Sequence, residues 1–197
     1  MPLGAFKAAL MGTAGVSTEN IVLLSTQPAS TSATISFTSG ITSTYKEYIF
    51  KFYNIHPVAH EEFTFNGSTD GGSNYDVTKT SSSTSAYNAE DSSGANVYYI
   101  TSGDLQQSTA FQQVAGAIYT DNDSSMVGTL HIFNPSDTTY VTQFMADTQR
   151  MDYSDPLHYS NRWLVAGYFN TTSAINAFQF KMTSGNFDGK IKMWGVK

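Results

Sequence analysis

The chain has 197 residues, a formal net charge of −6 and no cysteine, and only 13% of its residues are charged. This length suits one all-β domain, the acidic balance does not favour nucleic acid as a partner, and the lack of cysteine excludes disulfides, thiol catalysis and cysteine-ligated zinc. Aromatic residues make up 14% of the chain, a composition typical of sheet-rich proteins rather than disordered ones.

The first twenty residues differ from the rest because their apolar side chains follow helical spacing. Leu3, Phe6 and Leu10 recur at intervals of three and four residues, and Gly12 ends the pattern. We expect a short helix here, and so short a helix is marginal unless it packs on something. It either closes the end of its own domain or docks on another chain. We therefore treat residues 1–20 as an N-terminal anchoring arm.

From Ile21 onward, two-residue alternation of side chains predicts β-strands. The clearest is residues 46–55, where Tyr48, Phe50 and Phe52 share one face. Phe63 and Phe65 mark another strand. The remaining predicted strands are residues 21–26, 33–37, 96–101, 112–119, 126–133, 140–146, 162–170, 174–182 and 189–196. The polar segments 66–74 and 80–93 have no such alternation and are predicted to be loops.

This pattern corresponds to roughly ten to twelve strands and contains no helical periodicity beyond the arm, which excludes alternating βαβ units. It favours an all-β fold, namely an antiparallel two-sheet sandwich of jelly-roll type with a short N-terminal helical arm. We find no internal repeat and no linker, so residues 21–197 form one predicted domain. No apolar run approaches the ~18 to 20 residues that span a bilayer, so we expect no membrane insertion.

Several tyrosines lie within or beside polar segments, and these are Tyr75, Tyr87, Tyr153 and Tyr159. Tyrosine among Ser, Asn, Asp and Gly is typical of adaptable binding surfaces, because its ring offers a wide contact area and its hydroxyl can form hydrogen bonds. We predict loops that contact a receptor through these side chains. The alternative is that the same rings simply cover the ends of the sandwich.

The metal-ligand patterns in the chain are weak. Its histidines are His56, His60, His131 and His158. Pro57 lies between the first two, and the helical HExxH pair of zinc enzymes is missing. Several acids fall in predicted loops, where they either form turns or hold a Ca²⁺ ion: Asp70, Asp76, Asp121 and Asp123. We expect no metal and no cofactor, with a loop Ca²⁺ as the alternative.

Sugar cleavage needs two carboxylates that face one cleft, and three closely spaced pairs of acids are the candidates for it. Glu61 and Glu62 are neighbours in a predicted strand, so we expect them to point to opposite faces. The other pairs lie in predicted loops, where solvent exposure is the usual explanation: Asp121 with Asp123, and Asp152 with Asp155. No nucleophile elbow, P-loop or dinucleotide motif occurs. We predict that the protein is not an enzyme.

Four segments together carry a resemblance to a known group of proteins. They are Phe37–Ile41 followed by Thr44 and Tyr45, Phe133–Ser136, Phe178–Asn186 and Gly189–Lys197. From about residue 21 to the C-terminus, the chain resembles small virion structural and tail-fibre-type proteins of tailed phages that infect marine bacteria. The matching motifs are strand and turn signatures, so the resemblance implies a jelly-roll-like particle component and brings no catalytic residue with it.

Two functions are compatible with this resemblance. The chain is expected to be a tail-fibre or spike appendage, homotrimeric, which contacts a host-surface glycan or protein on the exposed surface of the virion. The alternative is a capsid (head) decoration protein whose arm docks on the shell and stabilises it. Other virion proteins, of the tail or of the capsid, are the expected partners. We prefer the appendage, because a protein that only reinforces the capsid shell does not need tyrosine-bearing loops.

Overall fold

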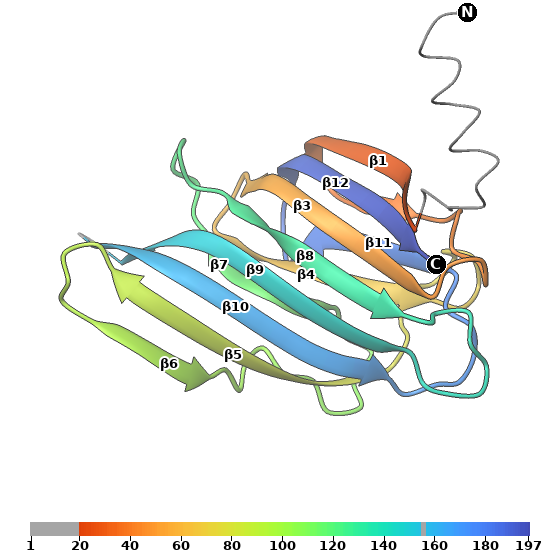
Figure 1. Cartoon of the computed structure of the whole chain (residues 1–197). Coiled ribbons are helices and arrows are strands. Elements are labelled where there is room, and N and C mark those ends of the chain that lie inside the picture. The colour runs from red at the N-terminus through yellow and green to blue at the C-terminus, as the bar shows by residue number, and fades with distance from the viewer. Residues whose placement is uncertain (1–19, 155–156) are drawn as a thin grey trace, which may run out of the picture.

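The computed structural model describes residues 20–154 and 157–197, and all regular elements in them are strands (Figure 1). The predicted arm, with Leu3, Phe6 and Leu10, lies outside these residues. The strands are β1 (Ile21–Ser32), β2 (Ile35–Phe37), β3 (Glu47–Pro57), β4 (Glu61–Ser68), β5 (Lys79–Ala89), β6 (Ala95–Tyr99), β7 (Gln112–Ile118), β8 (Met126–Phe133), β9 (Gln143–Ser154), β10 (Leu157–Phe169), β11 (Ala177–Met182) and β12 (Phe187–Val196).

The strands form two antiparallel sheets, which confirms the prediction of an all-β, two-sheet sandwich. The large sheet has eight strands in the order β1-β12-β3-β8-β9-β10-β5-β6, and the small sheet has four in the order β2-β11-β4-β7. In Figure 1 the large sheet crosses the front of the view from β1 to β6, and β4, β7 and β11 of the small sheet lie behind it. In the described part of the chain, no helical segment has the length and apolarity of a membrane span.

The two sheets have matching strand orders. The first four strands of the large sheet, β1, β12, β3 and β8, correspond in order to β2, β11, β4 and β7 of the small sheet, and each corresponding pair is consecutive in sequence. The chain thus passes repeatedly from one layer to the other. The hairpins β5–β6 and β9–β10 are inserted into this pattern, and they extend the large sheet beyond β8.

Phenylalanine rings from both sheets meet in the core. Tyr48, Phe50 and Phe52 of β3 are buried on one face, as their alternation predicted. Phe50 lies against Phe178 of β11 and Phe52 against Phe180, with ring centroids 5.5 Å apart in both pairs. Each such side chain contributes about 1.5–3 kcal/mol through burial, and edge-to-face ring contacts add to this.

The prediction of a loop over residues 80–93 is wrong, because β5 occupies most of that segment. Every β5 residue from Lys79 to Ala89 pairs with β10. Two of its buried positions, Ser83 and Ser85, carry small hydroxyl side chains instead of apolar ones. Ser83 donates a hydrogen bond to the Gly103 carbonyl at 2.8 Å, and Ser85 donates one to the Asn161 Oδ1 atom at 3.1 Å. Since these hydroxyls are satisfied by partners distant in sequence, the strand shows no hydrophobic periodicity.

Candidate functional site

The structure places three of the four predicted receptor tyrosines in strands rather than in loops. Tyr87 belongs to β5, Tyr153 to β9 and Tyr159 to β10. The prediction of loops was wrong for these three residues. For Tyr153 and Tyr159 the reason is that β9 and β10 pair with each other almost to their common turn, so that His158 still faces Tyr153 across the hairpin. Tyr75 lies in the connection between β4 and β5, and its buried hydroxyl has no hydrogen-bond partner among the described residues.

Tyr87 and Tyr159 come together with a third ring that the sequence did not single out, Tyr98 of β6. The ring centroids of Tyr87 and Tyr159 are 5.6 Å apart at 82°, and those of Tyr87 and Tyr98 are 6.0 Å apart at 70°. With Asp152 and Asn161, these rings line a cavity of about 180 Å³, which we call the tyrosine pocket. Adjacent strands bring them to one face of the sheet, so only strand pairing reveals the cluster.

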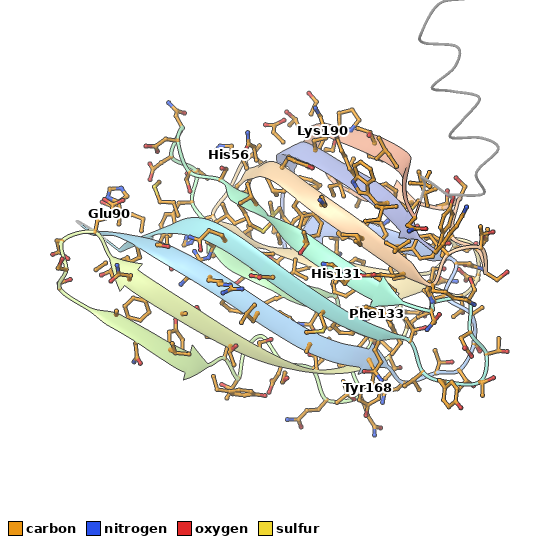
Figure 2. All side chains as sticks on the ribbon, in the orientation of Figure 1. His56, Glu90, His131, Phe133, Tyr168 and Lys190 are labelled. Atoms are coloured by element: carbon orange, nitrogen blue, oxygen red, sulfur yellow. The ribbon has the colours of Figure 1, made fainter. Side chains whose placement is uncertain are left out.

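The tyrosine pocket lies on the inner face of the large sheet, beyond the cover of the small sheet. β7 is the edge strand of the small sheet, and it packs on β9 and β10. Tyr98 pairs with Ser85 and therefore faces the same side as that buried serine. The pocket lies towards the tip of the β5–β6 hairpin, where Glu90 follows β5 (Figure 2). The inserted hairpins thus extend the large sheet past the edge of the small sheet, and the inner face of this extension is left uncovered.

Asp152 and Asn161 form the polar part of the pocket. Asp152 is held by Arg150, with Nη1 at 2.8 Å from Oδ1 and Nη2 at 2.8 Å from Oδ2. Asn161 is 2% exposed and donates from Nδ2 to the Asp152 Oδ2 atom at 3.4 Å. An ionised carboxylate has about four acceptor positions. The Tyr153 amide also donates to Oδ1 at 3.0 Å, so these contacts together use the acceptor positions of Asp152 and hold its carboxylate in place.

Arg150 is itself fixed by the small sheet. It is 7% exposed, and its Nη1 atom donates a short hydrogen bond to the Ala117 carbonyl of β7. The adjacent Gly116 makes room for it, because a Cβ atom there would lie 2.7 Å from Arg150 Nη2 and 2.9 Å from the Trp163 ring. The carboxylate of Asp152 is therefore positioned by a side chain that cannot move freely.

The tyrosine pocket has hydrogen-bonding atoms that the described residues do not use. Within the described ranges, none of Tyr87, Tyr98 and Tyr159 makes a hydrogen bond through its hydroxyl, and none of these oxygens is a buried unpaired atom. Three rings beside a carboxylate and an amide present both apolar faces and polar atoms to one small space. The arrangement suits a ligand that combines C–H surfaces with hydroxyl groups. Asp155, set beside Asp152 in the sequence as a possible acid pair, lies outside the described residues.

A larger concavity of about 520 Å³, which we call the outer groove, crosses the opposite face of the large sheet. His131 and Phe133 of β8 border it; both are labelled in Figure 2. Its apolar floor includes Met145, which is 56% exposed, and Leu164, which is 41% exposed. Exposed apolar side chains gathered in one concave surface are typical of sites that contact another molecule.

The charged groups in and beside the outer groove are paired with one another. Arg162 donates to both carboxylate oxygens of Asp147, at 2.9 and 2.6 Å, and these hydrogen bonds lower the pKa of Asp147. His131 Nδ1 lies 2.5 Å from Glu47 Oε1. The groove therefore offers apolar contact area and neutralised charges, whereas the tyrosine pocket offers unused hydrogen-bonding atoms.

The candidate metal-binding residues do not converge. No group of three or more His, Asp or Glu side chains able to hold a metal occurs in residues 20–154 and 157–197. His56 contacts the Ser124 carbonyl at 2.7 Å, and His60 stacks on Tyr119 with centroids 3.9 Å apart. Asp70 forms a turn instead, because it accepts hydrogen bonds from Ser68 Oγ at 2.6 Å and from the Asn74 amide at 2.9 Å.

The expectation that Glu61 and Glu62 point apart is wrong. Both carboxylates lie within hydrogen-bond distance of the Thr183 hydroxyl, closely for Glu61 and at 2.7 Å for Glu62. The register of β4 against β7 shifts between Glu62 and Thr64, and such an irregularity turns side chains away from strict alternation. The two acids hold the turn before β12, since the Thr183 amide also donates to the Glu62 carbonyl at 3.0 Å.

Comparisons of the chain with models of known protein families, with curated proteins and with solved structures gave no match.

Proposed function

We propose that this protein is a non-enzymatic virion structural protein, a tail-fibre or spike component, whose tyrosine pocket binds a host-surface glycan. The observation that carries the proposal is the convergence of Tyr87, Tyr98 and Tyr159 around Asp152 and Asn161. The rings offer flat apolar faces for the C–H groups of a sugar. The three unused tyrosine hydroxyls offer hydrogen bonds to its hydroxyl groups.

The chemistry of the pocket favours a neutral or basic sugar over a polyanion. Its lining contains the carboxylate of Asp152, and the chain as a whole carries a formal net charge of −6. The cavity of about 180 Å³ is smaller than the ~300 to 1,000 Å³ typical of sites for drug-sized molecules. A single ring at the end or branch of a glycan therefore matches it better than a long extended chain.

The proposed sandwich type is the jelly roll, in keeping with a particle component. What supports this is the matched order of β1-β12-β3-β8 and β2-β11-β4-β7: with the two hairpins set aside, the chain crosses between two four-stranded layers at every step except from β4 to β7. A jelly roll is a double-sheet fold of eight strands with Greek-key connections. On this proposal, β5–β6 and β9–β10 are insertions that carry the binding surface.

Assembly with other virion proteins, and into a homotrimer, is assigned in this proposal to the outer groove. Its support is the exposed apolar area of Met145 and Leu164. Replacing both by glutamate should leave the fold intact and convert a trimer to monomers in size-exclusion chromatography with light scattering. A wild-type protein that is monomeric at all concentrations would contradict the trimer.

The number of copies in purified particles distinguishes the two functions. Tens of copies or fewer indicate a tail appendage, and hundreds indicate a head decoration protein.

Binding of the glycan is tested on a glycan array, followed by calorimetry with the best ligand. We expect Tyr98→Ala and Tyr159→Ala to weaken binding about five- to thirtyfold, since loss of one stacked ring removes roughly 1–2 kcal/mol. Tyr140→Ala is the matched control, because Tyr140 is 74% exposed and lies outside the pocket lining. If the folded wild type binds no glycan, or if the pocket variants bind as well as the control, the proposal fails.

A further inference from the structure

A lysine amine is enclosed between the two sheets. Lys79, the first residue of β5, is 0% exposed. Its Nζ atom donates hydrogen bonds to the Asn66 Oδ1 atom at 2.7 Å and to the Val77 carbonyl at 2.8 Å. It also lies 5.7 Å from the centroid of the Phe169 ring. Charged lysine is almost never fully buried unless it is paired, so this amine needs an explanation.

The side-chain amide of Asn66 is held in one orientation. Its Nδ2 atom donates to the carbonyls of Tyr75 at 2.8 Å and Thr109 at 3.0 Å. Its Oδ1 atom accepts from the Gly67 amide at 2.8 Å as well as from Lys79. Exchanging the nitrogen and the oxygen would set donor against donor and acceptor against acceptor. The amide carbonyl is therefore the group that faces the amine.

These neighbours also prepare the two groups for reaction. The Gly67 N–H polarises the Asn66 carbonyl, and a backbone donor at this place would stabilise negative charge on its oxygen. Burial lowers the pKa of Lys79 to about 7, although the negative charge of Asp76 acts in the opposite direction. A substantial share of the amine is consequently unprotonated, and nucleophilic, near neutral pH.

We propose that Lys79 and Asn66 form an isopeptide bond that joins the two sheets covalently. The Nζ atom attacks Cγ of Asn66, a new N–C bond forms and the Cγ–Nδ2 bond breaks. One amine proton ends on the departing nitrogen, which leaves as ammonia, so no oxidant, reductant or cofactor is needed. Because Asn66 belongs to β4 of the small sheet and Lys79 to β5 of the large sheet, the bond fastens the inserted β5–β6 hairpin to the sandwich.

The test is the mass of the full-length chain after incubation at pH 8. We expect a species lighter than the sequence mass by one ammonia. Cleavage after glutamate and before aspartate should then yield a branched peptide that joins residues 63–69 to residues 76–90, because Glu62, Asp70, Asp76, Glu90 and Asp91 provide the cut sites. An unchanged mass with two separate peptides would overturn the proposal.

A second reaction with the same mass change must be distinguished. Asn66 precedes Gly67, and attack by the Gly67 nitrogen on the same Cγ would give a succinimide, which also releases ammonia. Lys79→Met abolishes the isopeptide but leaves the succinimide route open. We expect Lys79→Met and Asn66→Ala to keep the mass calculated from their sequences, with no loss of ammonia. If the ammonia loss persists in Lys79→Met, the proposal is wrong, and if either variant fails to fold, the branched peptide of the wild type still decides.

Discussion

The rings of Tyr87 and Tyr159 lie 5.6 Å apart at 82°, although they belong to two separately inserted hairpins. The contact exists because β5 pairs with β10 along the whole of β5, from Lys79 opposite Phe169 to Ala89 opposite Tyr159. Two insertions at distant points of the chain therefore build one surface. The polar side of that surface depends on Arg150 and Asp152, so the stability of this ion pair affects the proposed binding site.

Asp152→Asn should destabilise the fold by about 1–3 kcal/mol, because it leaves the guanidinium of Arg150 buried without its counter-charge. The expected value is below that for a fully buried pair, since the Asp152 side chain is 25% exposed. The matched control is Asp147→Asn on the same strand. There both partners are largely exposed, at 56% and 45%, so a loss of less than about 1 kcal/mol is expected. Urea unfolding measures both, and equal losses would contradict the role given to Arg150.

Gly116→Ala should destabilise the protein by about 1–3 kcal/mol, the usual range for overpacking. The new methyl group would lie 2.7 Å from Arg150 Nη2 and 2.9 Å from Trp163, both of which are largely buried. Gly94→Ala is its control, because nothing lies within 4 Å of a Cβ atom there. Thermal unfolding of the two variants compares them directly. A neutral Gly116→Ala would mean that Arg150 can shift, and that Asp152 is not rigidly positioned.

Phe180→Ala should cost about 3–5 kcal/mol, as expected for removing a buried aromatic ring. Phe180 of β11 is fully buried and contacts rings of both layers, including Phe50 and Phe52 of β3. Its loss opens a cavity between the sheets. The free energy of unfolding in urea gives the value, with Tyr140→Ala expected within about 0.5 kcal/mol of the wild type. A small loss of unfolding free energy in Phe180→Ala would contradict the central place of Phe180 in the core.

Asp70 should stabilise the β4–β5 connection only while it is ionised. A hydrogen bond from Ser68, followed by those from Asn74, lowers the pKa of Asp70 to about 2, below its usual value of 3.8. Because the folded-state pKa is the lower one, the stabilisation is complete above about pH 4 and is lost as the pH falls towards 2. The difference in urea midpoint between the wild type and Asp70→Asn should therefore be largest near pH 6 and shrink near pH 2.5. A difference that does not change with pH would contradict this role.

Sequence reasoning was most successful where side chains alternate in polarity. Tyr48, Phe50 and Phe52 were expected on one face of a strand, and all three are buried on β3. The reason is local: a strand directs every second side chain to the same side, so aromatic alternation is visible without knowing the partner strand. The all-β class and the antiparallel two-sheet architecture follow from many such segments, together with the lack of helical periodicity.

The tyrosine pocket could not be found in this way. Ser83 and Ser85 make β5 look like a polar loop, and Tyr98 was not selected because nothing local in the sequence places it beside Tyr87 and Tyr159. Whether a serine is buried depends on the acceptor it meets, here the Gly103 carbonyl and Asn161, and these come from distant segments. Local alternation therefore determined which segments become strands and which faces enter the core. Only tertiary pairing decided which hydroxyls are satisfied, which tyrosines meet and that Lys79 faces Asn66, because each depends on contacts between residues far apart in the chain.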